Sequence, residues 1–203
     1  TVTVNGNQSG LPSDFGYSGA RSNIRMSTGL YAPPGEVITV LVDQETSELD
    51  FSILIGAHTD SLWGKDIIKR HSKIYRNWEI ENTNTEVANS FGGPIYVSVP
   101  AGSVFGDLEL TISGAIRAPM FVLGDTSDFE WLYSEKENPA PWAELVSNNF
   151  IMTVPSSEIR ELDNPSQLMN WWDTALNMEH QLYGFEPWPR VERAVFDLSL
   201  IHI

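Results

Sequence analysis

The sequence predicts an α+β fold, in which a mainly β, sandwich-like N-terminal portion is followed by an α+β portion. Short runs of β-branched and aromatic residues fill the stretch from residue 36 to residue 123, and Gly/Pro turn signals separate them. One long stretch after residue 164 repeats apolar residues at helical spacing. The chain has 203 residues, of which 41% are hydrophobic. That length and composition allow a sizeable core, in one large domain or two small ones.

The expected strands of the N-terminal portion are runs in which apolar residues dominate or alternate with polar ones. They cover residues 37–42, 51–55, 95–99 and 108–112. Residues 115–123 form a further extended segment that Pro119 interrupts. Because proline has no backbone N–H to donate, this segment is expected to be an edge strand or to contain a bulge. Residues 1–26, rich in glycine, serine and asparagine, are expected to form an irregular arm, so that the β-rich portion covers residues 27–124.

The character of the sequence changes after residue 124, and residues 125–203 are expected to form the α+β portion. Strands are predicted at residues 150–154 and 194–198, where apolar residues are again dense. A short helical turn is expected to follow Pro155. This portion also contains the long helix, which is the strongest single prediction from the sequence.

The long helix is predicted over residues 165–182. Asn164 is an N-cap candidate, Pro165 suits the first helical position, and Gly184 suits the end. Its apolar stripe is expected to be buried, and it consists of Leu168, Trp171, Trp172, Ala175, Met178 and Leu182.

Charge and composition exclude several classes of protein. Twelve Lys and Arg residues stand against 27 Asp and Glu residues, which gives a formal net charge of −15. A field of this sign repels polyanions, so neither nucleic acid nor an acidic membrane surface is expected as a partner. The longest apolar runs are too short to cross a membrane. Cysteine is absent, which removes disulfides, thiolate metal ligands and cysteine nucleophiles together.

Residue chemistry alone predicts no catalytic residue and no metal ligand in this chain. Zinc hydrolases commonly place two histidines one helical turn apart, and no two of the four histidines are spaced that way. His58 and Asp60 share one loop, where they serve either as a turn brace or as part of a catalytic site. The brace is the favoured interpretation, because no Gly-x-Ser-x-Gly elbow supplies a nucleophile.

Eight short blocks of sequence carry a resemblance to a known family. They are STGLYAPPGE at 27–36, IGAHTD at 55–60, ANSFGGPIYV at 88–97, SGAIRAPMFVLG at 113–124, PWAEL at 141–145, TVPS at 153–156, WWD at 171–173 and VERAVFD at 191–197. In this order they resemble the enhancin-like, mucin-targeting zinc metallopeptidases, which form peptidase family M60. The blocks run from residue 27 to residue 197, and so many of them in one order make the resemblance specific.

The resemblance implies a gluzincin-like metallopeptidase fold for the α+β portion. It also implies a zinc cofactor in a longer parent protein, held by a His-Glu-x-x-His helix and a downstream glutamate that lie beyond residue 203. The motif glutamate would polarise the zinc-bound water that attacks the peptide carbonyl. No residue of this chain matches a zinc ligand or that glutamate, so the chain is expected to hold no zinc and to be inactive alone.

What the chain would supply is the wall of the substrate cleft. The resemblance implies a glycoprotein or peptide substrate and a secreted or cell-surface location for the parent. Residues 198–203 depart from the family pattern, so the chain is expected to be truncated there, with final residues that are not native. In the parent, the missing catalytic helix is expected to cover part of the apolar stripe of the helix at 165–182.

The extended segment at 115–123 contains the candidate cleft residues Arg117, Ala118 and Met120. An edge strand can pair with an extended peptide, which would place this segment beside the substrate. Arg117 would then contact an acidic or sialylated substrate, although a surface salt bridge is the alternative interpretation. Two other functions remain open at this point: a non-catalytic protein-interaction module of the same fold, and a free-standing carbohydrate-binding module.

Overall fold

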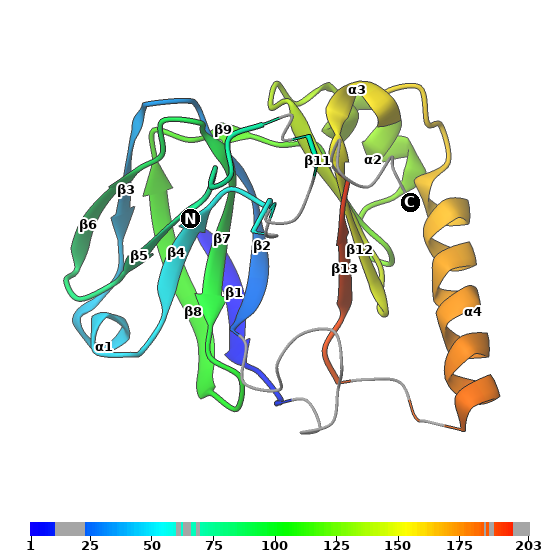
Figure 1. Cartoon of the computed structure of the whole chain (residues 1–203), viewed down its shortest axis with the longest axis horizontal. Coiled ribbons are helices and arrows are strands. Elements are labelled where there is room, and N and C mark those ends of the chain that lie inside the picture. Colours follow the sequence, from blue (N-terminus) through cyan, green and yellow to red (C-terminus); the bar gives the residue numbers. More distant parts are fainter. Residues whose placement is uncertain are drawn as a thin grey trace.

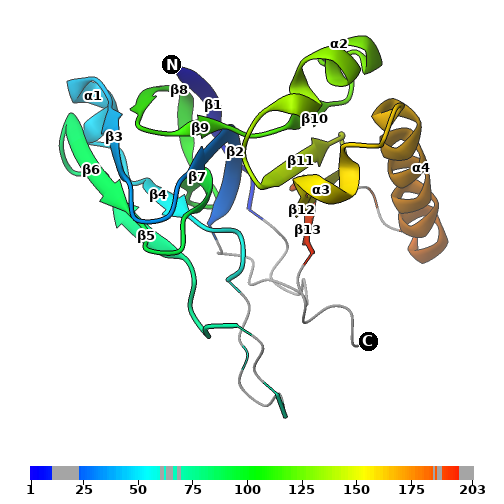
Figure 2. The same cartoon turned by 90° about the horizontal axis from the view of Figure 1, so that it is seen from above.

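The computed structural model describes residues 1–10, 23–59, 62, 66–67, 70–184, 186 and 189–196. Three sheets and a few helices make up this part of the chain (Figure 1). Two sheets pack face to face in the N-terminal portion, and the third sheet lies beside them with the longest helix on its far side (Figures 1 and 2). The fold is therefore α+β with mostly β structure, as the sequence predicts.

The N-terminal portion is a sandwich of two antiparallel sheets. The four-stranded sandwich sheet has the order β1-β8-β3-β6, with bounds Val2–Asn7, Val104–Ser113, Val37–Leu41 and Asn84–Ala88. The five-stranded sandwich sheet has the order β5-β4-β7-β2-β9, with bounds Arg76–Glu79, Ser52–Ile55, Gly93–Val99, Ile24–Ala32 and Ile116–Arg117. A one-turn helix, α1 (Gln44–Ser47), follows β3.

Strand β7 is buried on both of its faces. Ile95, Val97 and Val99 point into the sandwich core. Tyr96 points the other way, into a small cluster that Val195 of the third sheet also touches. A strand covered on both faces has a continuous run of buried residues instead of a clean alternation. The packing of the third sheet on the outer face of the sandwich therefore explains why the whole of β7 is buried.

Residues 1–26 are predicted to form an irregular arm, and this prediction is wrong for Val2–Asn7, which form strand β1. Val2 pairs with Leu110 and Val4 with Leu108 in the antiparallel ladder with β8, and Val4 is buried in the sandwich core. The alternation of Thr and Val at residues 1–4 is a strand pattern, but it is short and the glycines and polar residues that follow it obscure the signal. Strand β2 begins at Ile24, and residues 11–22 lie outside the described part of the chain.

The third sheet has the strand order β10-β11-β12-β13, with bounds Met120–Val122, Trp142–Val146, Phe150–Pro155 and Glu192–Val195. The outer pairs are parallel and the central pair is antiparallel. The helices of this half are α2 (Asp128–Tyr133), the 3-10 helix η1 (Glu135–Glu137), α3 (Ser156–Ile159) and α4 (Pro165–Tyr183). The chain passes from the sandwich into this sheet between β9 and β10, and the predicted division at residue 124 stays a prediction.

Helix α4 confirms the helix predicted at 165–182, including its end at Gly184, which adopts a left-handed conformation with φ of +72°. The N-terminus differs from the expected cap. The Asn164 side chain donates to the Gln167 side chain at 2.8 Å instead of capping the backbone. The carboxylate of Asp128, from α2, accepts from the Ser166 N–H at 3.0 Å, so a partner distant in sequence satisfies this end of the helix.

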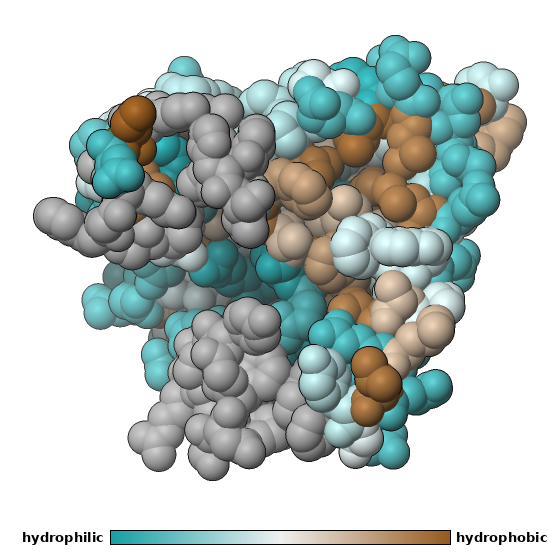
Figure 3. Space-filling view, turned by 45° about the vertical axis from the view of Figure 1, so that its right-hand side comes forward, coloured by the Kyte–Doolittle hydropathy of each residue, from teal (hydrophilic) through white to brown (hydrophobic). Residues whose placement is uncertain are grey.

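The buried face of α4 is rotated from the predicted apolar stripe. Leu168, Met169, Trp172 and Leu176 pack on the core of the third sheet, together with Phe121, Trp131 and Leu145. Trp171, Met178 and Leu182 are exposed instead, and apolar residues gather on the side of the molecule that carries this helix (Figure 3). The helix has apolar residues on two adjacent stripes, and the sheet covers only one. No helix in the described ranges is long and apolar enough to cross a membrane.

Two methionines of α4 provide a matched test of this arrangement. Met169 is fully buried, whereas Met178 is 64% exposed. Met169→Ala is expected to lower the free energy of unfolding by about 2–5 kcal/mol, because it leaves a cavity in the core. Met178→Ala is expected to change it by less than about 0.5 kcal/mol. Urea unfolding of the two variants measures the difference, and equal losses would mean that both stripes are buried.

Candidate functional site

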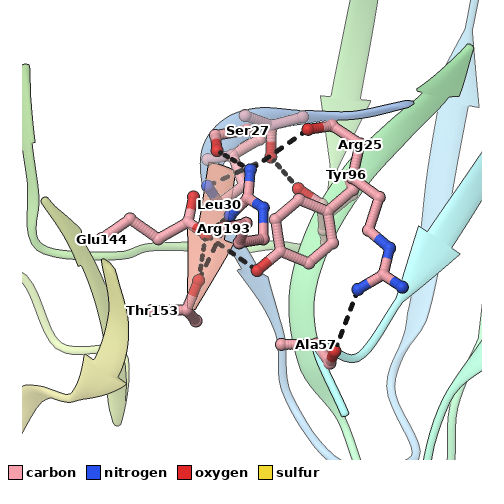
Figure 4. Close-up of polar contacts among 10 residues, drawn as sticks. Arg25, Ser27, Leu30, Ala57, Tyr96, Glu144, Thr153 and Arg193 are labelled. Atoms are coloured by element: carbon pink, nitrogen blue, oxygen red, sulfur yellow. Dashed lines mark hydrogen bonds and ion pairs between the residues drawn. The ribbon is translucent and has the colours of Figure 1, made fainter. Parts of the chain in front are cut away.

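A buried polar cluster joins the third sheet to the sandwich, and Arg193 of β13 lies at its centre (Figure 4). The guanidinium donates to the carboxylate of Glu144, in β11, and forms an ion pair with it. It also reaches strand β2 of the sandwich, where Nη2 donates to Ser27 Oγ at 2.9 Å and to the Arg25 carbonyl at 3.1 Å. One side chain of the third sheet thus donates hydrogen bonds to a hydroxyl group and to a backbone carbonyl of the sandwich.

One carboxylate oxygen of Glu144, Oε1, accepts hydrogen bonds from three side chains. In addition to Arg193, the hydroxyl of Tyr96 donates to it at 2.9 Å and the hydroxyl of Thr153 donates to it at 2.7 Å. The Arg193 guanidinium also lies over the Tyr96 ring, 4.8 Å from its centroid. The side chains of Arg193 and Glu144 are only 10% and 8% exposed. A buried charge persists when it is paired and hydrogen-bonded, and this pair meets both conditions.

Burial shifts the ionisation of the groups around this pair. It lowers the pKa of the Arg25 guanidinium, and the nearby charge of Arg193 adds to that effect. Arg25 spans the loop after β4 by donating to the Ala57 carbonyl at 3.2 Å and to Thr59 Oγ1. Burial, and after it the charge of Glu144, raises the pKa of the Tyr96 hydroxyl. Burial also raises the pKa of Tyr31 at the end of β2.

The two buried tyrosines predict how the protein responds to alkaline pH. Because the fold raises the pKa of both hydroxyls, it favours their neutral forms. Their contribution to stability is therefore complete below the usual tyrosine pKa of about 10, and it is lost as the pH rises through the raised values. During an alkaline titration, we expect phenolate absorbance from Tyr31 and Tyr96 to appear only as the protein unfolds. Tyr31→Phe or Tyr96→Phe is expected to reduce the rise in absorbance that accompanies unfolding. Ionisation of both tyrosines at a lower pH than the change in circular dichroism would contradict this expectation.

Two hollows lie at opposite ends of the same junction. A cavity of about 910 Å³ is lined by the end of β2 and the start of β11, and its lining includes Tyr31, His58, Phe91, Trp142, Glu158 and Phe196. A groove of about 480 Å³ is lined by the start of β2, by β13 and by the end of β11, and its lining includes Arg25, Met26, Met120, Val146, Arg190 and Glu192. We call them the junction cavity and the junction groove.

His58 connects the two halves of the chain at the junction cavity. Its Nε2 lies 3.2 Å from the carbonyl oxygen of Phe196, in a hydrogen bond. Its ring meets the ring of Trp142 edge to face, with centroids 4.7 Å apart. The side chain is buried. The expected partner of His58 in the loop, Asp60, lies outside the described residues.

The three predicted cleft residues have different surroundings. The Arg117 side chain is 72% exposed and lies 3.7 Å from the Glu135 carboxylate in a surface ion pair, which agrees with the alternative interpretation of that residue. Ala118 is buried in a small cluster with Tyr31. Met120 lines the junction groove. The contact of the three residues with a substrate stays a prediction.

The segment that carries these residues lies at the sheet edges, as the sequence predicts. Among the described strands, β9 is outermost in the five-stranded sandwich sheet and β10 is outermost in the third sheet. The backbone between them is largely paired within the protein. The Ala118 N–H donates to the Gly29 carbonyl at 2.9 Å, and the Pro119 carbonyl accepts from the Glu144 N–H at 3.0 Å. These bonds tie the segment to both halves and leave fewer groups for an added peptide than an open edge strand would.

In a chain without cysteine, the donor set that a zinc ion needs is three or more His, Asp or Glu side chains close together. In the ranges that the structure describes, no three His, Asp or Glu side chains gather closely enough to hold a metal ion. The zinc site that the family resemblance implies for a parent protein therefore stays a prediction about residues outside this chain.

Sequence reasoning missed the buried cluster of Arg193, Glu144 and Tyr96. One signal was present, since Glu144 is an acidic residue in the middle of the apolar strand WAELV. A charge at such a position predicts a buried partner, although the sequence does not say which residue it is.

Comparison with known proteins agrees with the predicted fold and with the predicted family. The profile of the N-terminal domain of M60-like peptidases matches residues 1–113, and the profile of peptidase M60, enhancin and enhancin-like, matches residues 114–200. TRPM8 channel-associated factor 1 from Bos taurus is 37% identical over 177 residues, which cover 86% of this chain and 19% of that protein. The chain thus spans about a fifth of the length of the curated relatives it matches.

Solved structures share the architecture at low sequence identity. A conserved protein of unknown function from Bacillus anthracis str. Ames matches with a TM-score of 0.73 and 18% identity, over 95% of this chain and 40% of that one. The M60 catalytic domain of ZmpC from Clostridium perfringens, solved in complex with the sialyl T antigen, matches with a TM-score of 0.63 and 17% identity, over 86% of this chain and 40% of that one. Together, the two profile matches along the chain show that it belongs to the M60-like peptidase family, enhancin and enhancin-like.

Proposed function

We propose that this chain is the N-terminal and cleft-wall part of a zinc metallopeptidase that cleaves glycoproteins such as mucins. The observation that carries the proposal is the match of residues 114–200, the half that contains the third sheet and α4, to the peptidase profile. The glycan in the related ZmpC structure supports a glycoprotein or glycopeptide substrate. A substrate of this kind supports a secreted or cell-surface location for the parent.

In this proposal, the zinc ligands come from a part of the parent outside this chain. A bound zinc ion would supply a Lewis acid and an activated water for peptide hydrolysis. No step of that reaction is assigned to residues of this chain, because its described residues form no cluster of three His, Asp or Glu side chains that could hold a metal ion. The role of the chain is to fix the cleft wall, and the Arg193–Glu144 pair supports this role because it ties the third sheet to the sandwich.

A non-catalytic interaction module is the second candidate function. The observation that favours it is the 37% identity to TRPM8 channel-associated factor 1, whose name describes a protein associated with a channel. On this alternative, the same fold would present a binding surface, and the parent would need no zinc. A carbohydrate-binding module, the third candidate, would bind sugar without cleaving peptide.

An assay of glycopeptide cleavage by the longer parent protein distinguishes between these candidate functions. We expect the parent to cleave a mucin-type glycopeptide, to lose that activity with 1,10-phenanthroline and to regain it when zinc is added back. The unglycosylated peptide of the same sequence serves as the control for glycan dependence. A folded parent that contains no zinc and cleaves neither peptide would overturn the peptidase proposal and favour the interaction module.

A further inference from the structure

The junction cavity has the size and position of a small-molecule site. Its volume of about 910 Å³ lies within the range of about 300–1,000 Å³ that such sites occupy. It is built where two sheets meet, from segments distant in sequence: the end of β2, the loop after β4, the turn before β7, and the ends of β11, β12 and β13. The buried cluster around Arg193 is a separate feature, because it contacts β2 at Arg25 and Ser27, whereas the cavity is lined by Tyr31 near the end of that strand.

Aromatic rings supply much of the lining. Tyr31 and Trp142 come from β2 and β11, and Phe196 follows β13. Phe91, in the turn before β7, is 48% exposed and also lines the cavity. The Trp142 ring packs against the His58 ring at an interplanar angle of 74°. Flat aromatic surfaces with few rotatable bonds favour a ligand that has a flat apolar face, and the C–H face of a sugar ring is one.

The charged groups among the described lining residues favour a neutral ligand. Arg70 and Glu158 border the cavity, so these two side chains contribute charges of opposite sign. Glu158 is exposed on α3, where it accepts from Ser157 Oγ at 3.3 Å. The formal net charge of −15 disfavours anionic ligands in general. A ligand rich in hydroxyl groups uses donors and acceptors together, which suits a rim with both kinds of group.

Two of the residues that line the cavity are glycines. Gly56 and Gly93 both line it, and their backbones approach each other closely. A Cβ atom at Gly93 would lie 2.6 Å from the Gly56 Cα, so no larger residue fits there without movement. This part of the lining is therefore two closely packed backbone segments.

We infer that the junction cavity binds a neutral mono- or disaccharide, with its ring against Trp142 and Phe91 and its hydroxyl groups toward Glu158. The choice of sugar rests on the proposed glycoprotein substrate, whereas binding itself requires neither zinc nor peptide cleavage. Failure of the peptidase proposal would leave saccharide binding measurable, and failure of saccharide binding would leave zinc-dependent cleavage measurable.

Isothermal titration of the 203-residue chain in metal-free buffer tests the inference. The probes are N-acetylgalactosamine, N-acetylglucosamine and the disaccharide galactosyl-N-acetylgalactosamine. Trp142→Ala and Phe91→Ala are each expected to weaken binding about tenfold, which is the effect of losing one aromatic contact. Trp171→Ala is the matched control, because Trp171 is 59% exposed on α4, away from the cavity lining. It is expected to leave binding unchanged.

Several results would overturn the inference. One is the absence of heat and of ligand-observed NMR signal for all three saccharides with a folded chain. Another is equal affinity of the Phe91→Ala and Trp171→Ala chains. Binding of the unglycosylated peptide, but of no saccharide, with loss in Phe91→Ala would assign the cavity to peptide instead. If Trp142→Ala does not fold, Phe91→Ala and Glu158→Gln decide the question, because both residues are exposed.

Discussion

Replacing Arg193 by methionine is expected to lower the free energy of unfolding by about 3–5 kcal/mol, since it leaves Glu144 as a buried charge without its partner. Both side chains are nearly inaccessible, and Glu144 is surrounded by donors that the arginine helps to hold in place. Methionine keeps most of the apolar volume of arginine, so the loss reports the charge and its hydrogen bonds. Urea unfolding of the folded chain provides the measurement.

Two further variants identify the cause of that loss. The double variant Arg193→Met with Glu144→Met removes both charges, and it is expected to be less destabilised than the sum of the single variants. Arg117→Met breaks the surface ion pair between Arg117, which is 72% exposed, and Glu135. This substitution is expected to lower the free energy of unfolding by about 0–1 kcal/mol. Equal losses for Arg193→Met and Arg117→Met would mean that the pair in the junction contributes no more than a surface ion pair.

Gly93→Ala is expected to have a similarly large effect, of more than about 3 kcal/mol. Gly93 has φ of +143°, a conformation that residues with a side chain rarely adopt. The added Cβ would also lie 2.6 Å from the Cα and 2.7 Å from the N of Gly56. Both contacts are to backbone, so relief requires β7 and the end of β4 to move apart.

Gly35→Ala is the matched control for this substitution. Gly35 has φ of +78°, but a Cβ added there would have no atom within 4 Å. Alanine at this position carries only the conformational cost of a left-handed backbone, about 1–2 kcal/mol. The difference between the two variants in thermal or urea unfolding reports the clash between β7 and β4. A Gly93→Ala chain as stable as the Gly35→Ala chain would show that the two strands separate at little cost.

The sequence predicts an element well when the residues that define it lie within one short segment. Helix α4 follows from its period, from Pro165 and from Gly184, all within one segment. Strand β1 was missed because its short Thr/Val alternation precedes a stretch of glycine, serine and asparagine. The burial of α4 was only partly predicted, since a helix with two apolar stripes does not specify which one the sheet covers.

The candidate site could not be predicted in the same way, because its parts are far apart along the chain. Tyr96 and Glu144 are 48 residues apart, and Arg193 and Ser27 are 166 residues apart. Their contact depends on how the third sheet packs on the sandwich, which no local pattern encodes. The VERAVFD block of the family resemblance contains Arg193 and the PWAEL block contains Glu144, but the resemblance assigned neither residue a role. The edge-strand argument placed the cleft candidates at Arg117, Ala118 and Met120, and Met120 lines the junction groove.

Zinc content and peptidase activity, measured on the purified 203-residue chain and on the longer parent protein, test whether the chain is the cleft wall of an enzyme whose zinc ligands lie elsewhere. After dialysis, we expect elemental analysis to find no stoichiometric zinc in the folded 203-residue chain, and assays with casein and mucin to find no cleavage. The parent is expected to hold zinc stoichiometrically and to cleave mucin. Stoichiometric zinc in the 203-residue chain, together with cleavage of casein or mucin, would contradict this assignment.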